Sequence, residues 1–162
     1  MAKWGLTHFD NLAIGFFTSY AKHNQIVPLI NCSIAKRVIK RYLQLNDIDC
    51  YKRALALSNY VWDIIIKWDY FAKNTVGMQF TTAVDSISAN IAEGFGRYGK
   101  KDKVRFYYYS FGSMKESLDW NEKAKYRKLL TREQYEHVLT ELQILPKEIH
   151  QLIKFTNIRL KE

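Results

Sequence analysis

Three glycines and a lysine stand at a spacing that binds phosphate in nucleotide-binding proteins. Gly94, Gly96 and Gly99 fit the dinucleotide fingerprint GxGxxG, and the stretch ending at Lys100 fits most of the phosphate-loop pattern GxxxxGK. In both motifs the glycines let backbone N–H groups approach a phosphate closely. Nucleotide binding is therefore the first chemistry that the sequence suggests.

The residues before these glycines argue against nucleotide binding. Six apolar residues are spaced by 4, 4, 3, 4 and 4 positions, which predicts one face of an α-helix: Val76, Phe80, Val84, Ile87, Ile91 and Phe95. A dinucleotide fingerprint instead follows a strand and opens a helix. Lys101 also replaces the Ser or Thr that holds magnesium in a phosphate loop. We predict that Gly94 and Gly96 form the C-terminal cap of a helix, with Gly94 in the left-handed conformation.

A polar row on the same helix is the second candidate for chemistry. Ser86, Asn90, Glu93 and Arg97 stand at i, i+4, i+7 and i+11, so they share one face of the helix. A catalytic seam is one interpretation, but the serine lacks an activating base. Asn is a poor interior helix former, which indicates a specific hydrogen bond. We favour a structural seam that fixes the register between helices or subunits.

Signatures of enzymes and metal sites do not appear in the sequence. The four histidines lack metal-ligand spacing: His8, His23, His137 and His150. Matches to SxxK at Ser33 and to SxN at Ser88 lack the third element of penicillin-binding enzymes, KTG. Cys32 and Cys50 lie far apart, which favours reduced thiols over a disulfide or a metal site. We expect no catalytic residue, no metal and no cofactor, and predict that the protein is not an enzyme.

Positive charge is concentrated in residues 97–132, which carry eleven Lys or Arg and four acidic residues in a chain of net charge +9. Such an excess is typical of a surface that meets a polyanion or an acidic protein, although basic residues can also merely solvate helix faces. We predict nucleic-acid contacts from a first cluster, Arg97, Lys100, Lys101, Lys103 and Arg105. A second cluster serves the same role or complements a helix dipole: Lys123, Lys125, Arg127 and Lys128.

Tyrosines are interleaved with the first cluster. Tyr98, Tyr107, Tyr108 and Tyr109 offer aromatic faces on which unpaired bases can stack. Consecutive residues point in different directions around a helix, however, so some of these rings must pack in the protein or against another subunit. We favour packing over stacking for the set as a whole.

Helical patterns recur along the chain and predict an all-α fold. Residues 47–68 form a first helix, capped by Asn46 or Asp47, with an apolar face of Ile48, Tyr51, Leu55, Trp62 and Ile65. The stripe that ends at Phe95 marks a second helix. A third begins near Lys101 and carries small residues on its flank that permit close helix approach: Ser110, Gly112, Ser113 and Ser117. A fourth opens at a capping box at Thr131 and bends at Pro146. Four such helices with short connections predict an antiparallel up-down-up-down bundle.

Residues 1–46 form an N-terminal extension of unknown role, before a bundle domain at residues 47–162. Residues 33–45 form a short basic amphipathic stretch within the extension, which suits a partner-binding helix, a nucleic-acid arm or translated upstream sequence. The chain shows neither a signal peptide nor a stretch long enough to span a membrane, so we expect a cytoplasmic protein without membrane contact.

Residues 86–97, with the sequence SISANIAEGFGR, and residues 112–116, GSMKE, carry a family resemblance. They resemble the signature of the four-helix-bundle proteins of ribosomal RNA intervening sequences, a family that includes the accessory variability determinant of diversity-generating retroelements. The similarity covers roughly residues 47–160, with Glu116 and Gln79 among the matching positions. It implies a basic homopentamer that binds nucleic acid and, in retroelements, engages a reverse transcriptase. Thr81 and Thr82 depart from the family pattern, which usually has two arginines there.

Together these patterns predict a non-enzymatic, oligomeric protein that binds RNA or DNA with weak sequence preference, as an accessory of a retroelement reverse transcriptase. An aromatic content of 15% supports oligomer formation, because one small bundle cannot cover so much apolar surface. The alternative is a protein-interaction scaffold encoded by an intervening sequence, without a nucleic-acid role. A neighbouring reverse-transcriptase gene would favour the first function, and a surrounding ribosomal RNA gene the second.

Overall fold

The bundle is built from four long α-helices. A computed structural model describes residues 43–160 of the protein. The long helices are α3 (Asp49–Ile65), α5 (Met78–Gly96), α6 (Lys100–Tyr126) and α7 (Arg132–Arg159). Three short helical turns complete the described part: η1 (Leu45–Asp47), α4 (Tyr70–Ala72) and the π-helical turn η2 (Lys73–Gly77). Residues 43–160 contain no strand, so the prediction of an all-α fold is confirmed.

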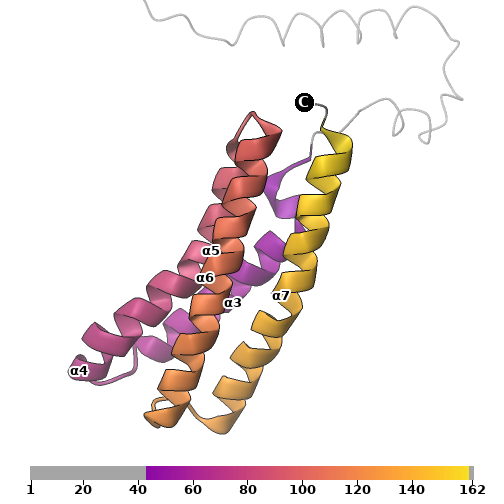
Figure 1. Ribbon diagram of the computed structural model, residues 1–162. Helices are drawn as coiled ribbons and strands as arrows, with labels where there is room; N and C mark the ends of the chain where they lie inside the picture. Colours follow the sequence, from indigo (N-terminus) through magenta and orange to yellow (C-terminus); the bar gives the residue numbers. More distant parts are fainter. Residues whose placement is uncertain (1–42, 161–162) are drawn as a thin grey trace, which may run out of the picture. The chain divides into compact units, whose positions relative to one another are not determined.

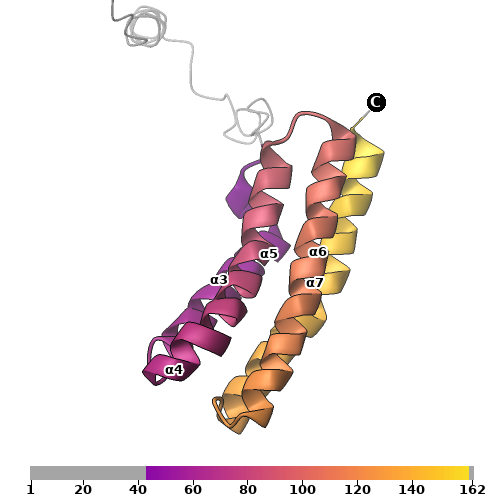
Figure 2. The same ribbon diagram turned by 60° about the vertical axis from the view of Figure 1, so that its left-hand side comes forward.

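Successive long helices run antiparallel and pack as neighbours (Figure 1). α5 packs against α3 and α6, and α7 closes the ring by packing against both α6 and α3. After a turn of 60°, α3 is seen beside α5 and α6 beside α7 (Figure 2). This is the predicted up-down-up-down bundle. The connection between α5 and α6 lies at the same end as the last turn of α7, whereas α4 and the connection between α6 and α7 lie at the other end.

The described bundle begins before the predicted domain start. Residues 43–46, which we assigned to the N-terminal extension, belong to the same compact unit as the helices, and Leu45 packs against the core. Most of the basic amphipathic stretch predicted at residues 33–45 lies outside the described residues. Its last two residues form the N-cap and first residue of the 3-10 turn η1.

The predicted cap of the first helix is wrong. Ile48, with an extended backbone, occupies the N-cap of α3 and its side chain makes no capping hydrogen bond. The Asp47 carboxylate instead accepts a hydrogen bond of 2.8 Å from the backbone N–H of Gln44, because it serves the 3-10 turn before α3. α3 also ends at Ile65, earlier than predicted. Asp69 then caps the next helix by accepting from the backbone N–H of Ala72 at 2.9 Å.

A π-helical turn lets the second helix pass close to the end of α3. α4, η2 and α5 follow one another with helical backbone angles at every junction, so they form one continuous helix. At Gly77 a Cβ atom would lie only 2.7 Å from Cγ2 of Ile65, so glycine is needed for this approach. The ammonium group of Lys73 donates to the backbone carbonyl of Ile66 at 2.6 Å and so satisfies a carbonyl at the end of α3.

Apolar stripes from all four long helices meet in one core. The largest fully buried side chains come from each helix in turn: Leu57, Val61, Phe80, Val84, Ile87, Ile91, Tyr107, Met114, Val138, Leu142, Leu145 and Ile149. Leu55 and Trp62, which we placed on the apolar face of the first helix, are exposed. The buried face of α3 instead follows residues spaced 4, 3, 4 and 3 positions apart, which lie on one side of the helix: Cys50, Ala54, Leu57, Val61 and Ile64.

Buried polar side chains join neighbouring helices within this core. The hydroxyl of Ser110 on α6 donates to the backbone carbonyl of Ile87 on α5 at 2.9 Å. The amide of Asn121, also on α6, donates to the backbone carbonyl of Tyr135 on α7 at 3.3 Å. These bonds fix the position of α6 against both neighbours because a buried donor without a partner is costly.

The predicted start of the fourth helix is confirmed. The backbone N–H of Gln134 donates to the Thr131 hydroxyl at 3.2 Å, and the Thr131 N–H donates to the Gln134 side chain at 2.9 Å. This reciprocal pair is the capping box read from the sequence. Pro146 lies inside α7, which continues to Arg159. The bend predicted at Pro146 stays a prediction.

Two buried side chains that lose a proton at high pH, Cys50 and Tyr107, predict a loss of stability in alkaline solution. Burial raises the pKa of the Cys50 thiol from 9.0 to about 12 and that of the Tyr107 hydroxyl from 10.0 to about 12. The pKa values of both groups are higher in the folded protein than in the unfolded chain. Their contribution to the free energy of unfolding is therefore complete below about pH 9 and is lost as the pH rises toward 12. We expect the free energy of unfolding, measured by urea denaturation under reducing conditions, to fall by roughly 1 to 2 kcal/mol between pH 8 and pH 10.

The matched control for this pH dependence is Cys50→Ala. This variant should be less stable at pH 8 but should lose less stability than the wild type as the pH rises to 10. An equal loss in both proteins would contradict the role assigned to the thiol.

Candidate nucleic-acid interface

The glycine run closes a helix, as predicted, but not through a left-handed residue. α5 continues through Gly94 to Gly96, and Arg97 forms its C-cap with an extended backbone. None of the glycines at residues 43–160 has a positive φ, so the left-handed conformation predicted for Gly94 is wrong. A Cβ atom at Gly94 would lie 2.6 Å from Cε1 of Tyr107 and 3.0 Å from the backbone oxygen of Lys103. Glycine is needed there because α6 passes against the α5 backbone.

The Lys103 side chain binds backbone carbonyls at the C-terminal end of α5 and is only partly exposed. Its ammonium group donates to the backbone carbonyl of Phe95 at 2.6 Å and lies 3.5 Å from that of Gly94. Burial lowers the pKa of Lys103. A lysine on α6 thus supplies the partner that the last carbonyls of α5 lack within their own helix. We predicted Lys103 as a nucleic-acid contact, and this hydrogen bond leaves its ammonium group less available to a phosphate.

Two arginines of the first cluster converge on one aromatic ring. The guanidinium carbon of Arg97, at the end of α5, lies 4.5 Å from the ring centre of Phe106 on α6, and that of Arg105 lies 5.9 Å from it. Each arginine also has an acidic partner one helical turn away: Glu93 pairs with Arg97, and Asp102 lies 3.5 Å from Arg105. The sequence offered no signal for Phe106, because its contact with Arg97 depends on how α6 packs beside α5.

The remaining cations of the first cluster and the tyrosines interleaved with them differ in their exposure. Lys101 is exposed and Lys100 is half-buried. Tyr107 is buried against Gly94, as the packing interpretation expected. The other three tyrosines are exposed: Tyr98, whose side chain is fully accessible, Tyr108 and Tyr109. We call Arg97, Lys101, Arg105 and Phe106, with Tyr98, the α5–α6 corner.

The second basic cluster is largely engaged within the protein. Lys123 forms an ion pair with Asp119 and lies 4.3 Å from the Trp120 ring centre. The ammonium group of Lys125 lies 3.8 Å from the ring centre of Tyr135, whose hydroxyl donates to Glu122. The contacts of Lys125 and Glu122 with Tyr135 hold the last turns of α6 against α7, whereas those of Lys123 lie within α6.

Arg127 and Lys128 are exposed and close the C-terminus of α6. Arg127 is the C-cap, and Lys128 is the one non-glycine residue of the described part with a positive φ, 58°. The backbone N–H groups of Lys128 and Leu129 donate to the carbonyls of Lys125 and Ala124, which is the hydrogen-bond pattern of a Schellman motif. This geometry agrees with the alternative that the second cluster serves a helix end.

The polar row on α5 makes its hydrogen bonds within its own helix. Ser86 donates to the carbonyl of Thr82 at 2.6 Å, and Asn90 donates to the carbonyl of Ser86 at 2.7 Å. Glu93 and Arg97 pair with each other. Within residues 43–160 these side chains therefore form no hydrogen bond with another helix, although Arg97 also contacts the Phe106 ring on α6. A role in the register between subunits stays a prediction.

Part of the segment at residues 112–116 also faces outward, although Met114 within it is buried in the core. Gly112 is exposed, and a Cβ atom there would meet nothing within 4 Å, so helix packing within the bundle does not require it. The backbone carbonyl of Ser113 accepts from Ser117 at 2.8 Å, and Glu116 lies 3.4 Å from the indole nitrogen of Trp120. The close helix approach that we predicted here involves the buried Ser110 and not Gly112.

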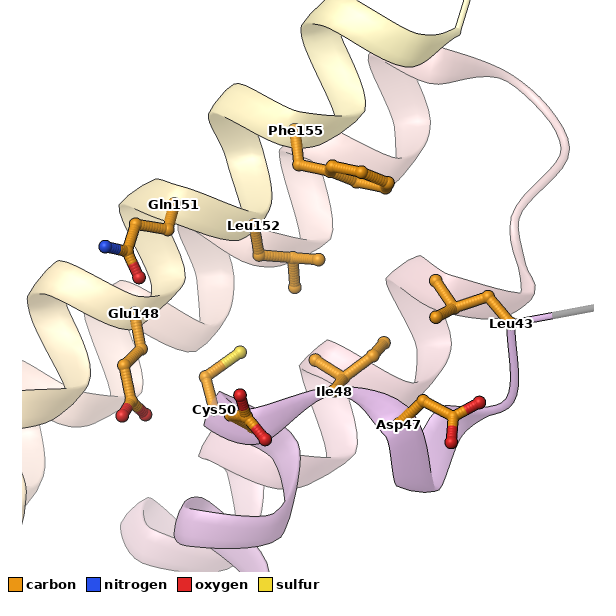
Figure 3. Close-up of a pocket in the computed structure, with 9 residues that line it drawn as sticks. Leu43, Asp47, Ile48, Cys50, Glu148, Gln151, Leu152 and Phe155 are labelled. Carbon is orange, nitrogen blue, oxygen red and sulfur yellow. The ribbon is translucent and has the colours of Figure 1, made fainter.

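A pocket of about 260 Å³ lies between the start of α3 and the last turns of α7 (Figure 3). Its lining combines four apolar side chains and the Cys50 thiol with four polar residues, Asp47, Asp49, Glu148 and Gln151. A pKa of about 12 keeps the Cys50 thiol protonated at neutral pH, and Glu148 is held by Arg53 at 3.0 Å. Neither group is therefore available as a nucleophile or base.

The described helices offer neither a metal site nor a membrane span. Between residues 43 and 160, His, Cys, Asp and Glu side chains form no group of three or more that suits a metal ion. No helix in the same range is long and apolar enough to cross a membrane. Two of the four histidines, His8 and His23, lie outside the described residues.

Comparisons with known proteins agree with the bundle. A solved structure from Bacteroides thetaiotaomicron VPI-5482, described as a protein of unknown function from the S23 ribosomal protein family, matches with a TM-score of 0.58 at 21% identity. The match covers 65% of this chain and 98% of that one, and at this identity it shows a shared fold. None of the curated proteins matches the chain. Residues 46–151 match the family model of the 23S rRNA-intervening sequence protein, so the chain belongs to this family.

Proposed function

We propose that this protein binds nucleic acid, without enzymatic activity, through the α5–α6 corner. The observation that carries the proposal is the convergence of Arg97 and Arg105 from two helices on Phe106, with the exposed Lys101 beside them. Guanidinium groups held on an aromatic ring are pre-oriented, so binding a phosphate costs them less side-chain entropy. The corner belongs to a chain of net charge +9, which favours association with a polyanion.

The proposal extends to the assembly and its partner. Following the resemblance noted from the sequence, we propose a homopentamer that acts in the cytoplasm as an accessory of a retroelement reverse transcriptase. A pentamer repeats the corner five times, and several weak contacts on one strand then add up to strong binding. Light scattering coupled to size exclusion, with and without RNA, measures the subunit number. A protein that stays at 19.2 kDa contradicts the oligomer.

A protein-interaction scaffold is the second candidate, and a surface at the opposite end of the bundle favours it. Five large apolar side chains are exposed around the end of α3 and the start of the second helix: Trp62, Ile66, Tyr70, Phe71 and Met78. A cluster of this kind is typical of a protein contact. Binding of a protein at this surface would not require the α5–α6 corner, so the two functions separate in experiments.

A charge-removal variant tests the nucleic-acid proposal. Replacing Arg97, Lys101 and Arg105 together with alanine should weaken binding of a labelled mixed-sequence RNA strand roughly tenfold or more at 0.1 M salt, measured by fluorescence anisotropy. The slope of log K against log salt should also fall, by about 0.7 for each phosphate that the variant no longer neutralises. Lys103 is left unchanged because it supports the end of α5.

The matched control removes the same charge elsewhere. Lys67, Lys147 and Lys154 are exposed residues of the bundle outside the α5–α6 corner, and their joint change to alanine should lower RNA affinity much less. Equal losses in the two triple variants would mean that only the total charge matters. RNA binding that neither variant weakens would place the contact elsewhere and defeat the proposal.

A further inference from the structure

We infer that the α5–α6 corner takes an unpaired nucleic-acid strand, which lies along one exposed face of α6. The inference rests on the proposed function and names the substrate class of that site. The face is defined by residues spaced 4, 3, 4 and 3 positions apart, which share one side of a helix: Lys101, Arg105, Tyr108, Gly112 and Lys115. All five are exposed. We call them the α6 stripe.

The composition of the α6 stripe matches a single strand better than a duplex. Lys101 and Arg105 precede its one aromatic ring and Lys115 follows it, and that ring, Tyr108, is 55% exposed. Duplexes keep their bases inside the helix and present phosphates and sugars outside, so exposed tyrosines gain little from them. An unpaired strand can place phosphates on the cations and stack a base on the ring. The fully exposed Tyr98 lies next to Arg97 and extends the same combination beyond the start of α6.

Gly112 supports the inference independently of the cations and the aromatic ring of the α6 stripe. It lies in the middle of a helix of 27 residues, where glycine makes the helix less stable than alanine does. Nothing in the described part of the chain needs it, since a Cβ atom would meet no atom within 4 Å. Glycine leaves the helix backbone open to close approach from outside, one turn beyond Tyr108. A strand whose base rests on Tyr108 would pass over this position.

Acidic residues limit the length of the α6 stripe. The next exposed positions at the same spacing are Asp119 and Glu122, which repel phosphate. Lys101 and Lys115 are separated by about 21 Å along the helix axis. At about 3.4 Å for each stacked nucleotide, the face accommodates on the order of six nucleotides.

Binding of a matched pair of probes tests the inference. A labelled 12-nucleotide RNA of mixed sequence and the duplex that it forms with its complement are titrated into the full-length protein at equal salt. The single strand should bind at least tenfold more tightly. Tyr108→Ala should weaken binding of the strand roughly fivefold and leave the duplex unchanged, whereas Tyr108→Phe should retain strand binding. Tyr70→Ala, which changes an exposed tyrosine at the other end of the bundle, should affect neither probe.

Gly112→Ala adds a signature that a purely structural role does not produce. The variant should unfold at a higher temperature than the wild type, because alanine favours the helix, and yet bind the single strand several-fold more weakly. Lower stability together with weaker binding would overturn the assignment of Gly112 to the strand.

The remaining outcomes separate the two proposals. If strand and duplex bind equally and Tyr108→Ala changes neither, while the Arg97, Lys101 and Arg105 triple variant weakens both, the proposed function stands and the inference fails. If Tyr108→Ala or Gly112→Ala lowers the molar mass of the assembly, the face is a contact between subunits and the inference fails. If neither probe binds to the wild type, the proposed function fails and the inference fails with it.

Discussion

Replacing Gly94 with alanine is expected to lower the free energy of unfolding by about 2 to 3 kcal/mol, through overpacking of the core. The added methyl group would lie 2.6 Å and 2.9 Å from two carbons of the Tyr107 ring and 3.0 Å from the Lys103 carbonyl oxygen. Tyr107 is 1% exposed and packs in the core, so its ring cannot avoid the added methyl group without shifting from its packed position. The gain in helix propensity from alanine, up to about 1 kcal/mol, does not offset this clash. Urea denaturation of the purified variant measures the loss.

Gly96 provides the matched control for Gly94. It lies two residues further along the same helix, has no positive φ, and a Cβ atom there would meet nothing within 4 Å. Gly96→Ala should therefore leave stability unchanged or raise it slightly. In a Tyr107→Leu background, Gly94→Ala should cost less than in the wild type, because the clash with the ring is removed. Equal costs at Gly94 and Gly96 would show that the contact with Tyr107 is not the cause.

Arg53→Ala is expected to lower the free energy of unfolding by about 2 kcal/mol, the second largest effect. The guanidinium of Arg53 on α3 donates to Glu141 at 2.7 Å and to both carboxylate oxygens of Glu148 at 3.0 and 3.1 Å, so it joins α3 to α7. All three side chains are less than one third exposed. Removing the arginine leaves two carboxylates close together in a partly buried place, which costs more than the loss of an exposed ion pair.

Lys52 is the control for Arg53. Its ion pair with Asp49 lies on the exposed side of the same helix, so Lys52→Ala should change stability little. Arg53→Lys should recover only part of the loss, because an ammonium group cannot bind two carboxylates with the planar geometry of a guanidinium. Thermal or urea denaturation of the three variants decides the outcome. A loss at Lys52 as large as that at Arg53 would contradict the bridging role.

Local signals in the sequence predicted the four long helices of this protein, but not the short turns η1 and η2 or the cap of α3. The apolar spacing from Val76 to Phe95 identified the second helix, and the capping box at Thr131 located the first residue of α7. These predictions succeeded because helix periodicity and capping involve residues within one or two turns of each other. The order of the helices and their short connections then predicted the bundle.

The candidate site depended on contacts between helices, which the sequence predicted only in part. The cations of the first cluster were recognised, but their roles divide in the structure: Arg97 and Arg105 meet at Phe106, whereas Lys103 binds carbonyls at the end of α5. An exposed lysine and a partly buried one look alike in a list of charges. Only the packing of α6 against α5 decides which of them a ligand can reach.

The amino-acid order alone predicted four amphipathic helices, the starts of α6 and α7, and a concentration of positive charge in residues 97–132. Only the packed helices explain why Gly94 is a glycine, which tyrosines are buried, and how Arg53 joins α3 to α7. The difference lies in the range of the interactions. Helix propensity and capping act over a few residues, whereas the contact of Gly94 with Tyr107 and that of Arg53 with Glu141 arise only when separate helices pack together.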